Sequence, residues 1–510
     1  MRPLLALLAL ALAAAGCVAP ESPSATSSPT DGLVAGLPTA GVAHALADRT
    51  LTPEELAAAP AMAGLQLSIG LDGVEPTIGI DADGTIFAEV FVEGQPTVVR
   101  SDDRGVTWTD VGPRLPNGMH NPPVTFDPYL YLDPATGRVF HNSNDLACAI
   151  ISWSDDKGAS WTTTPVGCGL GVGVADHQSM VAAKPRLVPA ALMTVYPNVV
   201  YSCTNTGATT ECATSLNGGA TFGPVVTVFP ETGNPDDCAG SILGHPMNDA
   251  EGRVYLAHGG CNNWPTVGVT EDDGLTWKSH VISRDIPLIE ALVVHDVSLA
   301  VDENGTLYAG WIGDKGLPAY SFSRDHGVTW APARVVSPAP VTATAFPAIA
   351  AGADGRLVFA YVGTTIEGGY EGRTTGGDGT ITDLSPITGG QGPTGWENAT
   401  WNAYLTVLAD ADSEDPVAVT VTANDPADPI ARGVCGKTRC GGMTDFIDAE
   451  IDPSGRPYAI FVDVCTGKCA DDPTAGKEGA VAFLGTLAVG PALRGDLGML
   501  EPLAAPPTSE

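Results

Sequence analysis

One eight-residue motif recurs five times in the middle of the chain. It has the form Ser/Thr-x-Asp/Asn-x-Gly-x-Thr/Ser-aromatic, and its copies begin at Ser101, Ser154, Ser215, Thr270 and Ser323. Successive copies start 53, 61, 55 and 53 residues apart. A repeat of this length indicates one supersecondary unit stacked several times, because each unit buries its apolar faces only against its neighbours.

The residue types of the motif suit the tip of a β-hairpin. An Asp or Asn oxygen accepts backbone N–H groups within a turn, Gly supplies a positive φ, and the aromatic side chain packs back onto the sheet. We therefore predict structural and not catalytic roles for the third-position residues, which are Asp103, Asp156, Asn217, Asp272 and Asp325.

A second pattern, a strand followed by Asp-x-x-Gly and another strand, alternates with the first. Clear copies contain Gly84, Gly137, Gly252, Gly305, Gly355 and Gly455, and a degenerate copy opens at Asp176. Two hairpins per unit make four strands, which is the blade of a β-propeller. We predict an all-β fold of four-stranded blades. Seven blades are favoured, and six with one irregular unit is the alternative. The 61 Gly and 42 Pro residues fit many short strands.

The N-terminus has the features of an export signal. Arg2 precedes an apolar run from Leu4 to Ala15, and Gly16-Cys17 follows. A short apolar run that ends in small residues is typical of a secretory signal. Ala14-Ala15-Gly16-Cys17 resembles the lipobox of prokaryotic lipoproteins, so residues 1–17 are expected to be removed up to a lipidated Cys17. An ordinary signal peptide is the alternative.

Composition divides the rest of the chain into three parts. Residues 18–62 are rich in Pro, Ser, Thr and Ala, which predicts a tether that carries a short helix starting at Thr52-Pro53-Glu54-Glu55. Residues 63–490 hold the repeats, with a Gly- and Thr-rich insertion at 363–400, and residues 491–510 form a tail.

The cysteines fit an exported protein. Without Cys17, ten of the eleven are left, an even number in an oxidising compartment. Local disulfides are expected, although Cys435 or Cys440 could pair with Cys465 or Cys469, and Cys465-x-x-x-Cys469 could instead be a metal knuckle. The expected pairs are Cys148/Cys168, Cys203/Cys212, Cys238/Cys261, Cys435/Cys440 and Cys465/Cys469.

Charge limits the partners. The chain has 59 acidic and 24 basic residues, a formal charge of −35. Such a surface repels nucleic acid and anionic membranes, so we expect membrane contact only through the lipid anchor. We predict a monomer on the cell-envelope surface that binds an extracellular glycan or protein. We expect no cofactor, with a structural Ca²⁺ as the alternative.

The five turn motifs resemble the Asp boxes of the bacterial neuraminidase repeat, found in sialidases and in many relatives that are not enzymes. The resemblance covers residues 70–490 and implies an Asp-box β-propeller of the sialidase-like superfamily. It does not imply activity, because these turns lie on the rim, away from any substrate.

The sialidase active site does not carry over to this chain. The resemblance places the first arginine of a carboxylate-binding triad at Val74, beside Glu75. Arg138, Arg253 and Arg356 follow hairpin glycines and are interpreted as solvated turn residues. Tyr404 is one of several tyrosines that could be a nucleophile, and no pattern singles it out.

The strands that open the blades predict a different site. Aligning the hairpins on their glycines places Glu75, Asp127, His177 and Asp296 at equivalent positions at one mouth of the central channel, with His245 and His295 nearby. These groups could cap backbone amides, bind a sugar or a cation, or perform acid/base chemistry. An acidic mouth disfavours an anionic ligand such as sialate.

Two functions follow from these features. The favoured one is a surface lipoprotein that binds extracellular glycan or protein at this mouth. The alternative is a sialidase-like glycoside hydrolase with a non-standard site that uses a carboxyl pair such as Glu75 and Asp127. An open pocket with two carboxyl groups would favour the enzyme, and a mouth closed by side chains would favour the binding protein.

Overall fold

A computed structural model describes residues 38–46, 49–145, 148–166, 176–206, 209–229, 242–260, 263–289, 296–336, 340–353, 355–366, 399–433, 446–472, 479–495 and 498–503. All of them belong to one of the two compact units of the chain, Leu33–Glu510. The predicted signal at residues 1–17, most of the 363–400 insertion and His295 lie outside the described residues.

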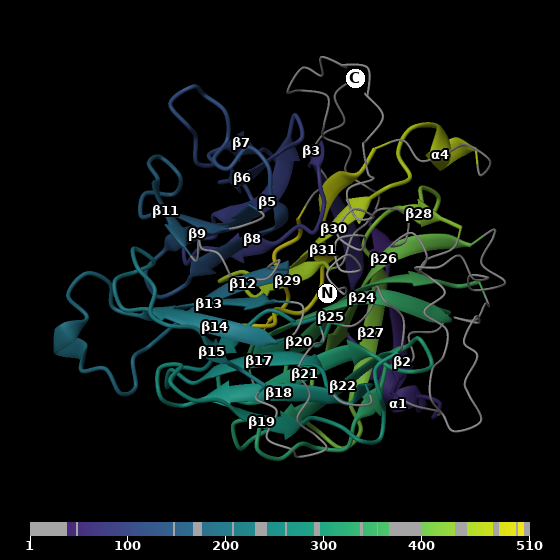
Figure 1. Ribbon diagram of the computed structural model, residues 1–510. Coiled ribbons are helices and arrows are strands. Elements are labelled where there is room, and N and C mark those ends of the chain that lie inside the picture. Colours follow the sequence, from purple (N-terminus) through teal and green to yellow (C-terminus); the bar gives the residue numbers. More distant parts are fainter. Residues whose placement is uncertain are drawn as a thin grey trace, which may run out of the picture. The chain divides into compact units, whose positions relative to one another are not determined.

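The described residues form antiparallel sheets, which confirms the all-β prediction (Figure 1). Four units are sheets of four strands in chain order. They contain β8 (Phe126–Asp133), β9 (Arg138–Asp145), β10 (Cys148–Ser154) and β11 (Thr162–Val166); β12 (Asp176–Ala183), β13 (Val199–Asn205), β14 (Thr210–Ser215) and β15 (Val226–Thr227); β16 (Met247–Asn248), β17 (Val254–Gly259), β18 (Pro265–Thr270) and β19 (Lys278–Val281); and β20 (Ser298–Val301), β21 (Leu307–Ile312), β22 (Pro318–Ser323) and β23 (Arg334–Val335).

Three further units are extended by other strands. The first contains β4 (Ile78–Ile80), β5 (Ile86–Val92), β6 (Gln95–Ser101) and β7 (Thr109–Asp110). The sixth contains β24 (Ala343–Ala351), β25 (Leu357–Thr364), β26 (Thr400–Leu408) and β27 (Val417–Thr422), with β28 (Ala431–Arg432) on β26. The last contains β29 (Asp448–Ile451), β30 (Pro457–Asp463) and β31 (Val481–Val489), and its fourth strand comes from the other end of the chain.

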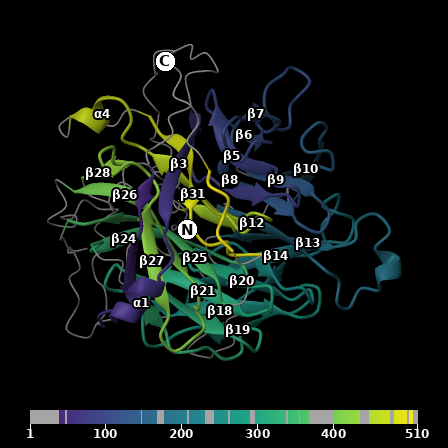
Figure 2. The same cartoon turned by 180° about the vertical axis from the view of Figure 1, so that it is seen from behind.

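That fourth strand is β3 (Ala63–Asp72), which pairs with β31 (Figure 2). The opening strands also contact one another in a cycle: β4 contacts β8, β8 contacts β12, and the series continues through β16, β20, β24 and β29 back to β4. A cyclic order of opening strands, seven of them among the described residues, is typical of a propeller.

The N-terminal segment before β3 is part of the sheet structure. β1 (Thr39–Ala40) pairs with β3, and β2 (Val42–Ala45) pairs with β27, so these residues belong to the domain and not to the predicted tether. The short helix is present as α1 (Pro53–Ala58), with Thr52 and Glu55 forming a capping box. No helix in the described ranges has the length and apolar character to cross a membrane.

The five repeated turns share one hydrogen-bond pattern. The third-position Asp or Asn accepts the N–H of the residue four positions later at 2.8–2.9 Å. The first-position hydroxyl accepts the N–H of the motif glycine at 2.8–3.1 Å. The Trp161 indole donates to Val111 O of the preceding unit at 2.6 Å, so this turn also joins two units.

Substitution of Asp103 tests the turn. Asp103 Oδ1 accepts the N–H groups of Val106 and Thr107, and Oδ2 accepts the Thr107 hydroxyl. Asp103→Ala should lower the free energy of unfolding by about 1–2 kcal/mol, because these donors lose their partner. Asp103→Asn should be nearly neutral, since Asn217 makes the equivalent bonds in the third copy. Equal losses in urea unfolding of the two variants would contradict this role.

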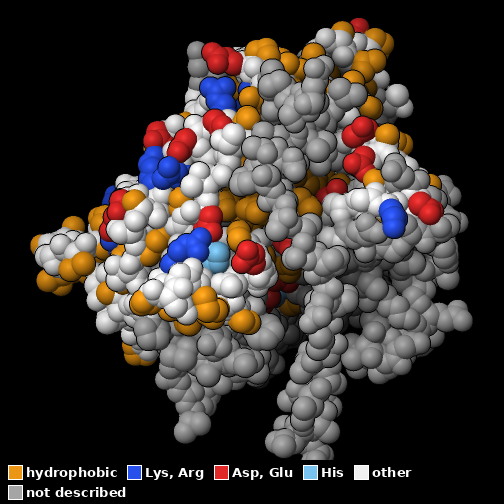
Figure 3. Space-filling view, turned by 90° about the horizontal axis from the view of Figure 1, so that it is seen from above, with side chains coloured by type: hydrophobic (Ala, Val, Ile, Leu, Met, Phe, Trp, Pro, Cys, Tyr) orange, Lys and Arg blue, Asp and Glu red, His pale blue; other side chains and the backbone are white. Residues whose placement is uncertain are grey.

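Two arginines that follow hairpin glycines, Arg138 and Arg253, are buried, so their interpretation as solvated residues is wrong, whereas Arg356 is half-buried. The Arg138 guanidinium is buried, 2.6 Å from Asp155 and 4.3 Å from the Tyr196 ring centroid. Arg253 is buried and pairs with Asp249, Glu251 and Glu271. Arg356 donates to Ala492 O. Acidic side chains bind the guanidinium groups of Arg138 and Arg253, while the aliphatic parts of these arginines are buried. Oppositely charged side chains also lie next to one another on the surface (Figure 3).

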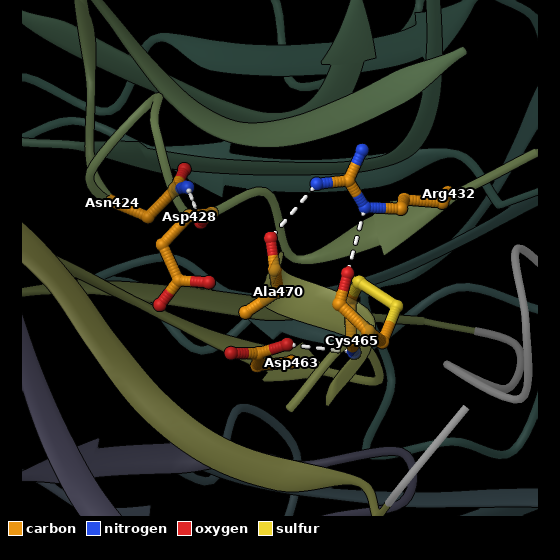
Figure 4. The surroundings of a disulfide bond; sticks show 7 residues. Asn424, Asp428, Arg432, Asp463, Cys465 and Ala470 are labelled. Carbon is orange, nitrogen blue, oxygen red and sulfur yellow. Dashed lines mark hydrogen bonds between the residues drawn. A yellow bond between two sulfur atoms is a disulfide. The ribbon is translucent and has the colours of Figure 1, made fainter. Parts of the chain in front are cut away.

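Two predicted disulfides are present. Cys203–Cys212 links directly paired residues of β13 and β14. Cys465–Cys469 closes a short loop at α4 (Lys468–Asp471), where Arg432 donates to Cys469 O and Ala470 O (Figure 4). A metal knuckle or a crossed pairing at Cys465 and Cys469 is therefore wrong.

The other three predicted disulfides are not tested. Cys148 lies on β10, but its expected partner Cys168 lies outside the described residues. Both members of each remaining pair, Cys238 with Cys261 and Cys435 with Cys440, lie outside the described residues. The pairings Cys148/Cys168, Cys238/Cys261 and Cys435/Cys440 therefore stay predictions.

A 3-10 helix, η1 (Ala190–Leu192), lies between β12 and β13 of the third unit.

Candidate functional site

The opening strands begin with an unusual backbone conformation. Glu75, Asp127, His177 and Phe346 have φ values of 53°, 48°, 49° and 55°, in the left-handed region that non-glycine residues rarely adopt. Register shifts between Phe126 and Tyr129, Asp176 and Ser179, and Ala345 and Ala348 mark a β-bulge at three of these positions. Backbone strain of this kind concentrates at functional sites.

Side chains from four units meet beyond these bulges. The His245 ring lies edge-on to Tyr129 at 4.8 Å and to Phe446 at 4.9 Å between ring centroids, and Phe446 contacts His177 at 5.4 Å. His245 Nδ1 is 3.6 Å from Asp448 Oδ1. Tyr129 belongs to the second unit, His177 to the third, His245 to the fourth, and Phe446 and Asp448 to the last. Units that are not neighbours touch only across the propeller axis. We call these five residues the axial cluster.

Two carboxyl groups of β29 belong to this region. Asp448 Oδ2 accepts the Ile78 N–H at 3.1 Å and Oδ1 accepts the Ala449 N–H at 2.9 Å, so the backbone fixes this carboxylate. Glu450 lies two residues further along the strand and keeps some accessible surface. Burial raises the pKa of the Glu450 carboxyl to about 7, and the nearby charge of Asp448 adds to the rise, while Arg494 opposes it.

Tyr129 lies near enough to these carboxyl groups to be affected by their charge. Burial raises the pKa of Tyr129 well above its usual value, and the charges of Asp448 and Glu450 raise it further. The side chain is 5% exposed, and within the described part of the chain its hydroxyl makes no hydrogen bond. The hydroxyl can therefore donate to, or accept from, a bound molecule or water.

The predicted mouth residues are only partly brought together. His177 and His245 lie in the axial cluster, and Asp127 Oδ2 accepts the His177 N–H at 2.9 Å. Glu75 and Asp296 are buried, so neither presents an open carboxylate. Tyr404 is buried on β26 and stacks on Tyr361 at 5.8 Å, which makes it a core residue.

Sequence reasoning missed Tyr129, Phe446, Asp448 and Glu450. Their spacing in the sequence could have indicated two of them, since Tyr129 lies two residues after the aligned Asp127, and Asp448 lies two residues after Phe446. A bulge adds a residue to one strand, so simple alternation from Asp127 assigns the following side chains to the wrong face.

Among the residues placed by the structure, no three His, Cys, Asp or Glu groups come together in a way that could hold a metal ion.

Glu450→Gln tests the carboxyl group at the axis. The unfolded chain ionises Glu450 near its ordinary pKa of 4.5, whereas the folded protein does so near a pKa of about 7. Ionisation therefore favours unfolding as the pH rises from 4.5, and the full penalty is present above 7. Because Gln does not ionise, Glu450→Gln should raise the free energy of unfolding by about 2 kcal/mol at about pH 8 and hardly at all at about pH 4. An equal shift of the urea midpoint at both pH values would contradict this.

The fold and the axial cluster together define an all-β protein of the β-propeller class. No family model matches the chain, and no curated protein matches it. Among solved structures, the BP39L lectin from Burkholderia pseudomallei is similar at 10% identity and a TM-score of 0.46, covering 85% of this chain and 99% of that one.

Two other solved structures show similar agreement. The NanB sialidase from Streptococcus pneumoniae has 12% identity and a TM-score of 0.39, covering 86% of this chain and 72% of its own. A protein of unknown function from Dyadobacter fermentans has 13% identity and a TM-score of 0.38, covering 81% of this chain and 94% of its own. These similarities assign neither an activity nor a ligand to this chain.

Proposed function

We propose that this protein is an exported, lipid-anchored β-propeller that binds extracellular glycan through its axial cluster. The observation that carries the proposal is the meeting of the rings of Tyr129, His245 and Phe446, from three units, beside Asp448. Packed aromatic rings next to one fixed carboxylate suit recognition of a ligand better than a reaction that needs room for water between two carboxyl groups.

The groups in the cluster match sugar chemistry. Aromatic rings pack on the apolar faces of pyranose rings, and a fixed carboxylate accepts hydrogen bonds from hydroxyl groups. Asp448 is 20% exposed at its side chain, and the Tyr129 hydroxyl can donate or accept. The formal charge of −35 disfavours polyanionic glycans.

A glycan array tests this function directly. We would use the full chain with Cys17→Ser, which removes the expected lipidation site, and a second protein that also carries Tyr129→Ala. Selective binding that is lost with Tyr129→Ala, while Glu54→Gln binds like the parent, is the expected result. No binding to any glycan, or binding indifferent to Tyr129, would refute the proposal.

A glycoside hydrolase is the second candidate, supported by one observation. A carboxyl group with a pKa of about 7 beside a second carboxylate is the arrangement of a general acid and its partner. Because Glu75 is buried, this observation favours Glu450 with Asp448 over the pair Glu75 and Asp127. Turnover of fluorogenic glycosides, sialosides included, that is abolished by Glu450→Gln and kept by Glu54→Gln would establish the enzyme.

Lipidation at Cys17, the absence of a cofactor and the monomeric state are part of the proposal. Mass spectrometry of the mature N-terminus should find an acylated Cys17 in the wild-type protein. Thermal unfolding should be the same in EDTA and in calcium if no structural ion is bound. Light scattering of the Cys17→Ser protein should give the mass of a single chain.

A further inference from the structure

We propose that the axial cluster recognises the protonated amino group of an amino sugar. This inference rests on the proposed glycan-binding function and names the chemical class of the sugar. Three features carry it: a fixed carboxylate, aromatic rings beside that carboxylate, and a tyrosine hydroxyl that makes no hydrogen bond with another described residue.

The carboxylate is Asp448. Each of its oxygens accepts one backbone N–H, from Ala449 and from Ile78, and each keeps a lone pair for another donor. The His245 imidazole lies 3.6 Å away, which is too far for a hydrogen bond. Asp448 is therefore held in one orientation and retains the capacity to accept an ammonium group, which forms charge-assisted hydrogen bonds.

The rings supply the second feature. The rings of Tyr129 and Phe446 each contact the His245 ring, with interplanar angles of 70° and 83°. A cation next to aromatic faces is stabilised by the ring quadrupole, and more so where water is excluded. Neutral and anionic sugars gain nothing from this interaction.

The Tyr129 hydroxyl is the third, independent feature. It is almost wholly buried, makes no hydrogen bond within the described chain, and lies near enough to Asp448 and Glu450 to feel their charge. Its oxygen can accept from an ammonium group while its proton goes to a sugar hydroxyl.

The surrounding charges agree with a cationic ligand. Glu450 follows Asp448 on β29, and Asp127 lies beside His177 on the neighbouring units. Arg494 bonds to Ile451 O at the far end of β29. The contacts between arginines and aromatic rings in the described parts of the chain involve other rings than those of the cluster. A protonated His245 would compete with the ligand for Asp448.

Calorimetric titration tests the proposal. The full chain with Cys17→Ser would be titrated at neutral pH and low salt with a glucosamine tetramer, its fully N-acetylated counterpart, and tetralysine. We expect the glucosamine tetramer to bind at least about tenfold more tightly than the acetylated sugar. Its affinity should fall as salt is added, because salt screens the charge interaction.

Variants separate recognition from folding. Asp448→Asn should lose about tenfold in affinity for glucosamine and little for any neutral sugar. Tyr129→Phe removes only the oxygen and should lose several-fold, with an unchanged circular dichroism spectrum. Glu54→Gln, at an exposed site on α1, serves as the matched loss of a carboxylate and should bind like the parent.

The outcomes distinguish this inference from the function on which it rests. Equal binding of the amine and the acetylated sugar, with Asp448→Asn unaffected, would overturn the amino-group assignment and leave glycan binding intact. Binding of tetralysine without the sugar would overturn the assignment to a glycan. No binding on a glycan array would refute both.

Discussion

Deletion of residues 1–72 is expected to leave a chain that does not reach a cooperative native state. The deletion removes β3, the fourth strand of the last unit, whose register with β31 runs from Ala63 opposite Val489 to Asp72 opposite Val481. β3 also pairs with β5 at Asp72, so it joins the last unit to the first.

The size of this effect follows from burial. Leu65, Leu67 and Ile69 of β3 are buried in the cluster shared by the first and last units. At about 1.5–3 kcal/mol for each buried side chain, their loss removes roughly 5–9 kcal/mol, which is comparable with the whole stability of about 5–15 kcal/mol of a typical domain. The exposed edge of β31 would in addition invite aggregation.

Two comparisons isolate β3. Deletion of residues 1–50 removes β1 and β2 but keeps β3, and it should give a folded, less stable protein. A peptide of residues 60–73 added to the shorter chain should restore a sharp thermal transition. A cooperative transition in the 1–72 deletion without the peptide would show that β3 does not close the structure.

Glu89→Ala is expected to be the most damaging single substitution in the described core. Glu89 of β5 and His141 of β9 are both 0% exposed, and Glu89 Oε1 lies 3.3 Å from His141 Nε2 between the first and second units. Removing the Glu89 carboxyl leaves His141 Nε2 with only the Ser143 hydroxyl, 3.2 Å away, and breaking a buried pair of this kind costs about 3–5 kcal/mol. Urea unfolding would measure the loss.

The paired substitution is the control. Glu89→Leu with His141→Leu should lose less than the sum of the two single changes, since neither polar group is then left alone. Glu54→Ala, at an exposed site, should change little. Burial raises the pKa of the Glu89 carboxyl, so Glu89→Gln should be best tolerated at high pH, where ionisation of Glu89 favours unfolding. Additive losses in the double variant would show that the pair is not coupled.

The repeated parts of the molecule were predictable because turn chemistry is local. Asp103 and its four counterparts bond only to residues within the same few positions, so the pattern in the sequence is the pattern in space. The same holds for the Thr52 cap and for Cys203–Cys212 across two paired strands.

The axial cluster was only partly predictable because it is assembled from distant residues. Alignment found His177, which occupies a repeated position, and indicated His245 as a residue near such a position. It could not find Tyr129, because its contacts depend on a bulge that changes which face a side chain takes, or Asp448, because its contacts with Ile78 and His245 join distant parts of the chain. The burial of Arg138 was missed for a related reason, since Tyr196, which covers its guanidinium, lies far along the chain.

The pairing of β3 with β31 also determines when the last unit can be completed during folding. Leu67 lies opposite Leu484, so a strand that is synthesised early cannot pair until a strand that is synthesised late is present. At about 5–20 residues per second, the intervening chain takes roughly 20–80 seconds to synthesise. During that interval Leu65, Leu67 and Ile69 are an unsatisfied apolar strand, which is a target for chaperones and a starting point for aggregation. Ring closure is thus a late, long-range event, and its speed depends on how quickly these two segments find each other.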